Sequence, residues 1–125
     1  MEASVSKTIS NTAIEKFCVD TGDFHPLHSD LKYCKNNGFR DIVAHGMLVS
    51  SYTSMIVGMF LPGENALVFA QNFEYFKPVF AGDTIDVHGE IDKKIKRFNV
   101  IEVKFTIKVE SEIVSSGVVK VKLRN

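Results

Sequence analysis

The sequence predicts an α+β fold in which a curved antiparallel sheet wraps around one central apolar helix. Between residues 47 and 60 the apolar side chains recur with a period near 3.6, which indicates a helix. From residue 63 onward they alternate with a period of two, which indicates strands. Because a helix that is apolar around most of its circumference needs cover on most sides, we expect the following strands to curl around it.

The first half of the chain holds the shorter elements. We expect a strand at 5–9, followed by a helix that Ser10 caps and Gly22 ends, since serine and glycine are favoured at these positions. A second short helix is expected at 30–37. The pair of proline and glycine at 62–63 ends the central helix.

Four antiparallel strands are expected in the second half. The clearest is 101–109, where five apolar residues alternate with charged residues and threonine, so that one face is buried and the other is exposed to water. Turn residues near Gly82 and Asn99 separate the strands. Weaker alternation predicts the other three strands at 67–76, 85–95 and 119–123.

Length and charge limit the range of functions. We expect residues 1–125 to form a single domain, because two domains of half this length would each bury too little apolar surface. Fifteen basic and fifteen acidic side chains cancel, so we expect no nucleic-acid partner. The longest apolar stretch, 47–61, is too short to span a bilayer and is interrupted by serine and threonine, so we expect no membrane segment.

The N-terminus and the cysteines indicate a compartment. The first residues lack the basic start and the apolar run of a secretory signal. Cys18 and Cys34 are too few for a disulfide framework, and we expect both to be reduced thiols in the core. A cytoplasmic protein is therefore expected.

Three of the four histidines, His25, His28 and His45, fall within 21 residues and near several aspartates. We do not expect a metal site, because Pro26 takes His25 out of helical geometry and no cysteine stands at ligand spacing. Two interpretations remain. Either these side chains are surface and capping groups of a loop, or Asp23 and His28 form an acid–base pair that a stiff loop aims at one water molecule.

Gly46 is a second candidate feature, because it lies at the start of the apolar helix. The first N–H groups of a helix have no acceptor within the helix, and glycine has no side chain to obstruct a ligand. The Gly46 N–H could therefore bind a carbonyl oxygen that gains negative charge. Alternatively, His45 and Gly46 only form a tight entry into a buried helix.

These features occur in segments that closely resemble the MaoC-like (R)-specific enoyl-CoA hydratases of the hot-dog fold. The matching segments read TGDFHPLHSD at 21–30, IVAHGM at 42–47 and PVFAGDT at 78–84. The resemblance covers about residues 12–123. It implies one hot-dog domain that needs no cofactor and adds water to a trans-2-enoyl-CoA to give an (R)-3-hydroxyacyl-CoA.

The resemblance also implies roles for single residues. Asp23 and His28 would activate the water, and the Gly46 N–H would polarise the thioester carbonyl. Ser54 would support Asp23. His25 stands where many relatives have asparagine, so it would shape the loop or the edge of the substrate site. The substrate would be an acyl-CoA or an acyl-carrier-protein thioester.

Several further expectations concern the substrate and the assembly. The acyl tail would lie against the central helix and the strand at 67–76. The candidates for the apolar wall around it are Met55, Met59, Phe60 and Phe69, although these side chains could equally be ordinary core residues.

The alternative function is a thioester-binding protein without hydratase activity, or a thioesterase, on the same fold. Unpaired edge strands predict a homodimer. A basic cluster at 93–97 is either a solvated hairpin or a contact for the phosphates of coenzyme A.

Overall fold

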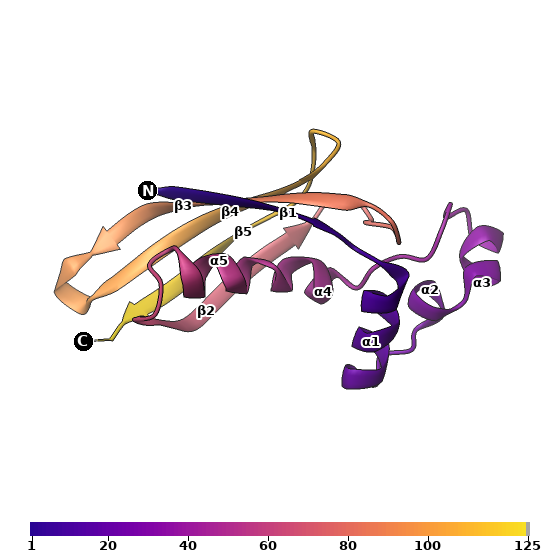
Figure 1. The fold of residues 1–125 in the computed structure, drawn as a ribbon, viewed down its shortest axis with the longest axis horizontal. Helices are drawn as coiled ribbons and strands as arrows, with labels where there is room; N and C mark the ends of the chain where they lie inside the picture. Colours follow the sequence, from indigo (N-terminus) through magenta and orange to yellow (C-terminus); the bar gives the residue numbers. More distant parts are fainter. Residues whose placement is uncertain (125) are drawn as a thin grey trace.

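The computed structural model describes residues 1–124, in which a curved five-stranded antiparallel sheet holds two helical segments against its inner face (Figure 1). The order across the sheet is β1-β3-β4-β5-β2, so β1 and β2 are its two edges. This is the predicted α+β architecture. The strands are β1 (Glu2–Thr8), β2 (Ala66–Tyr75), β3 (Thr84–Ile95), β4 (Val100–Val109) and β5 (Glu112–Leu123).

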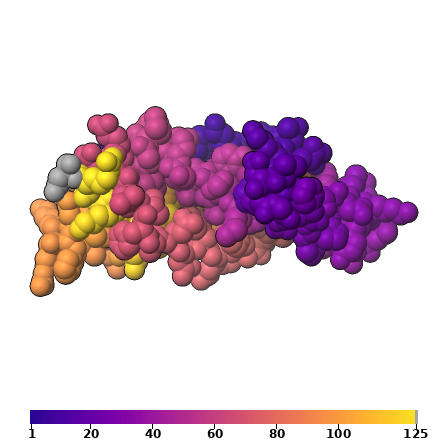
Figure 2. Space-filling view, turned by 90° about the horizontal axis from the view of Figure 1, so that it is seen from below, coloured from indigo at the N-terminus to yellow at the C-terminus, as the bar shows by residue number. Residues whose placement is uncertain are grey.

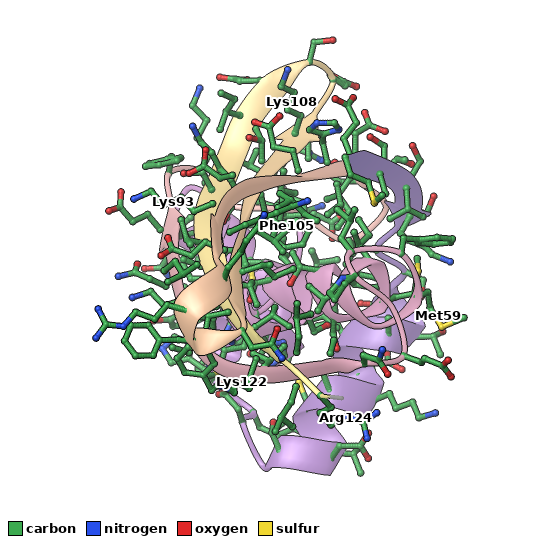
Figure 3. All side chains as sticks on the ribbon, turned by 90° about the vertical axis from the view of Figure 1, so that its left-hand side faces the viewer. Met59, Lys93, Phe105, Lys108, Lys122 and Arg124 are labelled. Carbon is green, nitrogen blue, oxygen red and sulfur yellow. The ribbon has the colours of Figure 1, made fainter. Side chains whose placement is uncertain are left out.

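The centre of the core lies on β4, at Phe105. This side chain is fully buried, and it occupies the middle of the molecule in Figure 3. In the strand register it stands opposite Gly89 on β3 and Gly117 on β5. A Cβ at Gly89 would lie 2.6 Å from the Phe105 ring, and a Cβ at Gly117 would lie 2.4 Å from the Asn72 carbonyl oxygen. Both positions therefore need glycine, because neighbouring groups already fill the space.

The predicted central helix is present in two segments, α4 (Gly46–Ser51) and α5 (Thr53–Met59), with Tyr52 between them. The hydroxyls of Ser51 and Thr53 donate to backbone carbonyls three residues earlier, at 2.6 and 2.8 Å. Such bonds compete with the helical hydrogen bonds, which explains the interruption. None of the helices among the described residues is long and apolar enough to cross a membrane.

The short helices gather beyond one end of the sheet (Figure 1). Ser10 caps α1 (Asn11–Thr21), and Gly22 ends it with a φ of 79°, as predicted. The helix α3 (Leu31–Asn36) begins after Asp30, whose side chain accepts the Tyr33 N–H. Cys18 and Cys34, one on each helix, are buried free thiols, in agreement with the prediction.

Several elements differ from the predictions: β1 begins at Glu2 instead of residue 5, and two larger differences lie elsewhere. Residues 26–29 form a helical turn, α2 (Pro26–Ser29), instead of a continuous loop. The turn forms because proline is well suited to the first helical position, and the preceding His25 caps it by accepting the Leu27 N–H. In addition, β5 starts seven residues before the predicted strand. The segment 112–118 includes two serines and a glycine that mask the alternation.

Candidate active site

Three segments that are separate in the sequence meet at the beginning of α4. They are the loop after α1, the turn α2, and residues 43–46. Nitrogen or carboxylate oxygen atoms of Asp23, His28 and His45 lie within 4.8 Å of one another. The structure therefore brings together the two predicted acid–base residues, and it adds a third group, His45, to which the sequence analysis assigned no part in the acid–base pair.

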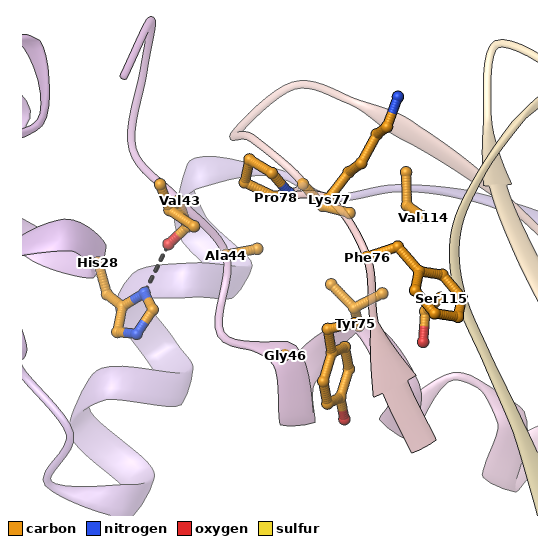
Figure 4. Close-up of a pocket in the computed structure, with 12 residues that line it drawn as sticks. His28, Val43, Ala44, Gly46, Tyr75, Phe76, Lys77, Pro78, Val114 and Ser115 are labelled. Carbon is orange, nitrogen blue, oxygen red and sulfur yellow. Dashed lines mark hydrogen bonds between the residues drawn. The ribbon is translucent and has the colours of Figure 1, made fainter. Parts of the chain in front are cut away.

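His28 is held in one tautomer. Its Nδ1 lies 2.6 Å from the Val43 carbonyl oxygen, the bond drawn as a dashed line in Figure 4. Because a carbonyl only accepts, Nδ1 carries the proton of the neutral ring and Nε2 keeps its lone pair. Burial lowers the pKa of His28 below its usual range, and this outweighs the opposing effect of the Val43 carbonyl. The ring is therefore neutral at pH 7, with Nε2 available as a base.

Asp23 is placed by the end of α1. Its N–H donates to the Thr21 hydroxyl at 3.2 Å, and its carboxylate accepts the His25 N–H at 3.2 Å. The side chain is 52% exposed, so the carboxylate remains open to solvent on one side. One water molecule could contact both this carboxylate and His28, because two hydrogen bonds of ordinary length span their separation.

Gly46 is the first residue of α4 and lines the same cavity as His28 (Figure 4). The cavity has a volume of about 350 Å³, which is within the range of small-molecule sites. A Cβ at Gly46 would lie 3.1 Å from the Tyr75 ring, so the glycine allows this ring to approach the helix start. The Tyr75 hydroxyl is in turn 2.9 Å from the Ser50 hydroxyl.

Sequence reasoning missed most of the cavity wall. Tyr75 lies at the end of β2, in register with the cavity residue Ser115 on β5. The signal was present, because alternation along β2 places Tyr75 on the same side of the sheet as Phe73, which packs against the core. The other side chains of the wall that the prediction did not include are Val43, Ala44, Val49, Phe76, Lys77, Pro78, Val79 and Val114.

The predicted acyl wall is not at this cavity. Met59, Phe60 and Phe69 are each more than half exposed, and Met59 points away from the molecule in Figure 3. Met55 is partly buried against the core. None of these four side chains is among the described residues that line the cavity with Gly46. A role for them in substrate binding remains a prediction.

The predicted supporting residues lie in different places. His25 is the cap of α2, and its ring lies 5.8 Å from that of His28, in a position to shape the loop. Ser54 is exposed on α5, and within the described chain no hydrogen bond joins it to Asp23. Its predicted support of Asp23 remains a prediction.

The cluster of Asp23, His28 and His45 is poorly arranged for a metal ion. The rings of His28 and His45 are stacked, with centroids 3.8 Å apart and planes at 24°. An imidazole lone pair lies in the plane of its ring, so stacked rings direct their lone pairs side by side and not toward a common point. The Nε2 of His45 is also only 3.1 Å from the Asp23 carbonyl oxygen.

Known proteins share this fold and sequence pattern. An (R)-specific enoyl-CoA hydratase of Rhodospirillum rubrum is 30% identical over 115 residues, which are 92% of this chain and 80% of that protein. A mitochondrial 3-hydroxyacyl-[acyl-carrier-protein] dehydratase of Arabidopsis thaliana is 32% identical over 80 residues, 64% of this chain and 47% of that protein. The solved (R)-hydratase of Aeromonas caviae has a TM-score of 0.94 at 27% identity, covering 98% of this chain and 94% of that one.

The solved structure confirms the hot-dog fold that the resemblance implied. A family model described as "MaoC like domain" matches residues 1–113, which include Asp23, His28 and Gly46. Because this model matches most of the chain and the relatives agree with it, the chain belongs to the MaoC-like hydratase and dehydratase family.

Proposed function

We propose that this protein is an enoyl-thioester hydratase, which adds water to a trans-2-enoyl thioester to give the (R)-3-hydroxyacyl thioester and also catalyses the reverse dehydration. The observation that carries the proposal is the placement of three groups. A ring nitrogen of His28 and the Asp23 carboxylate are close enough to share one water molecule, and Gly46, at the start of α4, lines the cavity that His28 also lines.

The proposed reaction assigns a different task to each group. The Asp23 carboxylate accepts a hydrogen bond from the water and orients it. The Nε2 of His28 removes one proton as the water oxygen bonds to C3, and it then delivers this proton to C2. The net change is the addition of one water molecule, with no charge left over. The reverse sequence eliminates water.

Gly46 has the electrostatic task in this proposal. When the oxygen of water bonds to C3, the electrons of the double bond move toward the thioester carbonyl, whose oxygen becomes negative. A backbone N–H at the first position of a helix has no partner within the helix, and the helix dipole favours negative charge there. A donor of this kind lowers an activation barrier by about 3 kcal/mol.

The proposed substrate is an acyl thioester carried by coenzyme A or by an acyl carrier protein. The relative from Rhodospirillum rubrum is named for a CoA thioester, and the relative from Arabidopsis thaliana for a carrier-protein thioester. At about 30% identity either carrier is compatible with this chain. The two carriers share the thioester and its pantetheine arm, so both belong in the test.

The decisive experiment measures loss of the conjugated enoyl absorbance with a series of trans-2-enoyl-CoA chain lengths and with one enoyl-carrier-protein substrate. We expect loss with at least one of them and formation of the (R)-3-hydroxyacyl product on a chiral column. Release of free thiol without hydration would indicate a thioesterase. Binding without any turnover would indicate a thioester-binding protein.

We also propose that two copies of the chain pair along β2. This strand is a sheet edge, and edge strands readily pair with another chain. Figure 2 shows this face, where α5 (magenta) and β2 (rose) lie next to each other. Exposed apolar side chains occur at the end of α5, on β2 and just after β2, namely Met59, Phe60, Leu67, Phe69 and Phe76.

Sedimentation or light scattering at micromolar concentration tests the dimer. We expect twice the monomer mass, and a shift toward the monomer for Phe69→Asp, which places a charge on the exposed surface of β2. Phe98→Asp is the control, because Phe98 is equally exposed but lies at the tip of the β3–β4 hairpin. A monomer mass for the unmodified chain would contradict the proposal.

A further inference from the structure

His45 combines deep burial with an unpaired polar atom. The residue is 3% exposed. Its Nε2 lies 3.1 Å from the Asp23 carbonyl oxygen, so Nε2 donates this bond and Nδ1 of the neutral ring has only a lone pair. Nδ1 is buried and has no hydrogen-bond partner among the described residues. Buried polar atoms without partners destabilise a fold, so one that persists needs an explanation.

The ring of His45 also determines where the ring of His28 can lie. The two imidazoles stack, with centroids 3.8 Å apart. Phe17, on α1, contacts His45 as well, with a centroid distance of 4.6 Å and a tilt of 52°. His28 is thus fixed by two contacts, the Val43 carbonyl at the edge of its ring and the His45 ring at its face.

The backbone adds a third link. His45 is the residue before α4, so it directly precedes Gly46. One side chain therefore contacts the backbone of Asp23 and the ring of His28, and its own backbone leads into the Gly46 N–H. His45 thus touches or adjoins the three residues that the proposed reaction uses, and these come from three separate segments of the chain.

We infer that His45 is the positioning residue of this site, and that its N–H holds the Asp23 loop while its ring face holds His28. Together these contacts keep the Asp23 carboxylate and the Nε2 of His28 directed at the same water molecule. The inference rests on the proposed hydratase function. It assigns His45 no contact with the substrate.

The chemistry of the side chain explains why histidine occupies this position. Phenylalanine would offer a ring face without a donor, and glutamine would offer a donor of similar reach without a ring. A position that needed only apolar filling would be better served by a side chain without the unpaired Nδ1. Histidine supplies both contacts at the cost of that atom.

Two variants separate the two contacts. His45→Phe keeps the ring and removes the donor to Asp23, so amide hydrogen exchange at residues 23–25 should accelerate, while the ¹⁵N imidazole signals of His28 should keep the Nδ1–H pattern. His45→Gln keeps a donor and removes the ring, so the His28 signals should change and the loop should stay protected. Both variants should lower kcat by about 100-fold with a smaller change in KM, as misplaced catalytic groups do.

Cys18→Ala is the matched control. Cys18 is buried with its Sγ 3.7 Å from Nε2 of His45, so the change loosens the same cluster but leaves both contacts of His45 in place. We expect kcat within about twofold of the unmodified protein, as for a residue outside the reaction. If Cys18→Ala reproduces the effects of the His45 variants, His45 acts only through packing and the inference is wrong.

The remaining outcomes also distinguish the inference from the proposed function. Unchanged kcat in either folded His45 variant contradicts the inference while the hydratase function stands. If the unmodified protein turns over none of the thioesters, the hydratase function fails, and the exchange and imidazole signals still decide whether His45 fixes the loop and the ring. Identical changes of both signals in the two variants also overturn the inference, because the contacts would then not be separable.

Discussion

The middle of the sheet and the segment that leads into α4 both contain buried side chains, but these side chains differ in kind. On β4, Val103, Phe105 and Ile107 are fully buried and apolar, and the strands on both sides supply regular backbone hydrogen bonds. In the residue before α4, the buried His45, Nδ1 has no hydrogen-bond partner within the described part of the chain. The sheet therefore stabilises the fold. At the cluster, in contrast, a buried nitrogen without a partner lowers stability locally.

The sharpest test changes the cluster without changing the sheet. Asp23→Asn and His28→Ala should each lower turnover by roughly 100-fold to 10,000-fold, which is the usual contribution of a positioned acid or base. Neither side chain belongs to the apolar core, so the unfolding temperature should change little. Enzyme assays and thermal unfolding by circular dichroism measure the two effects. Turnover near that of the unmodified protein in either variant would show that the pair is wrongly assigned.

The reverse experiment changes the sheet without changing the cluster. Phe105→Ala should lower the free energy of unfolding by about 3–5 kcal/mol, because it leaves a cavity between β3 and β5. Activity per folded molecule should persist at a temperature where the variant is folded. Phe98→Ala removes an equally large but exposed ring, and it should cost at most about 0.5 kcal/mol. Equal losses in a urea titration would contradict the distinction between the two regions.

A third prediction isolates the electrostatic part of the site. Gly46→Pro removes the backbone donor but is compatible with the first turn of a helix, so turnover should fall by about 100-fold or more. The control Gly46→Ala keeps the donor. Both variants introduce a Cβ about 3.1 Å from the Tyr75 ring, so the difference in kcat between them reports on the loss of the N–H together with the ring carbons that replace it. Equal kcat values would remove Gly46 from the mechanism.

A fourth prediction uses pH and concerns His28. Burial lowers the pKa of His28 in the folded protein, so the unfolded chain binds this proton more readily. The stabilisation from neutral His28 is present above about pH 6.5 and is lost as the pH falls through the lower folded pKa. Urea titrations from pH 7.5 to 5 should show declining stability, with a shallower decline in His28→Asn. An unchanged decline in that variant would exclude His28 as the cause.

The smallest effect is expected at the basic hairpin between β3 and β4. This hairpin lies at the opposite end of the sheet from α1–α3 (Figure 1), and its basic side chains are exposed. Alanine at Lys93, Lys94, Lys96 and Arg97 should leave KM and stability nearly unchanged. A KM that rises in these variants and depends on salt would instead indicate a contact with the phosphates of coenzyme A.

The same two regions differ in how much of their structure could be predicted from the sequence. Alternation and helix caps are local signals, so the sequence correctly predicted α1 with Ser10 and Gly22 at its ends, and the alternating face of β4. The turn α2 was missed because its four residues are too few for a periodic pattern. Tyr75 was missed as part of the site because its role depends on how closely the end of β2 approaches the start of α4.

The sequence by itself determined most helices and strands, the core residues on β4, and the candidate roles of Asp23, His28 and Gly46. These features depend on periodicity, capping and motif spacing, which are read within short segments. Only the tertiary structure decided which side chains surround the cavity and that His45 contacts both Asp23 and His28. The physical reason is that these contacts join segments that are distant in the sequence. They exist only after the helices have packed against the sheet.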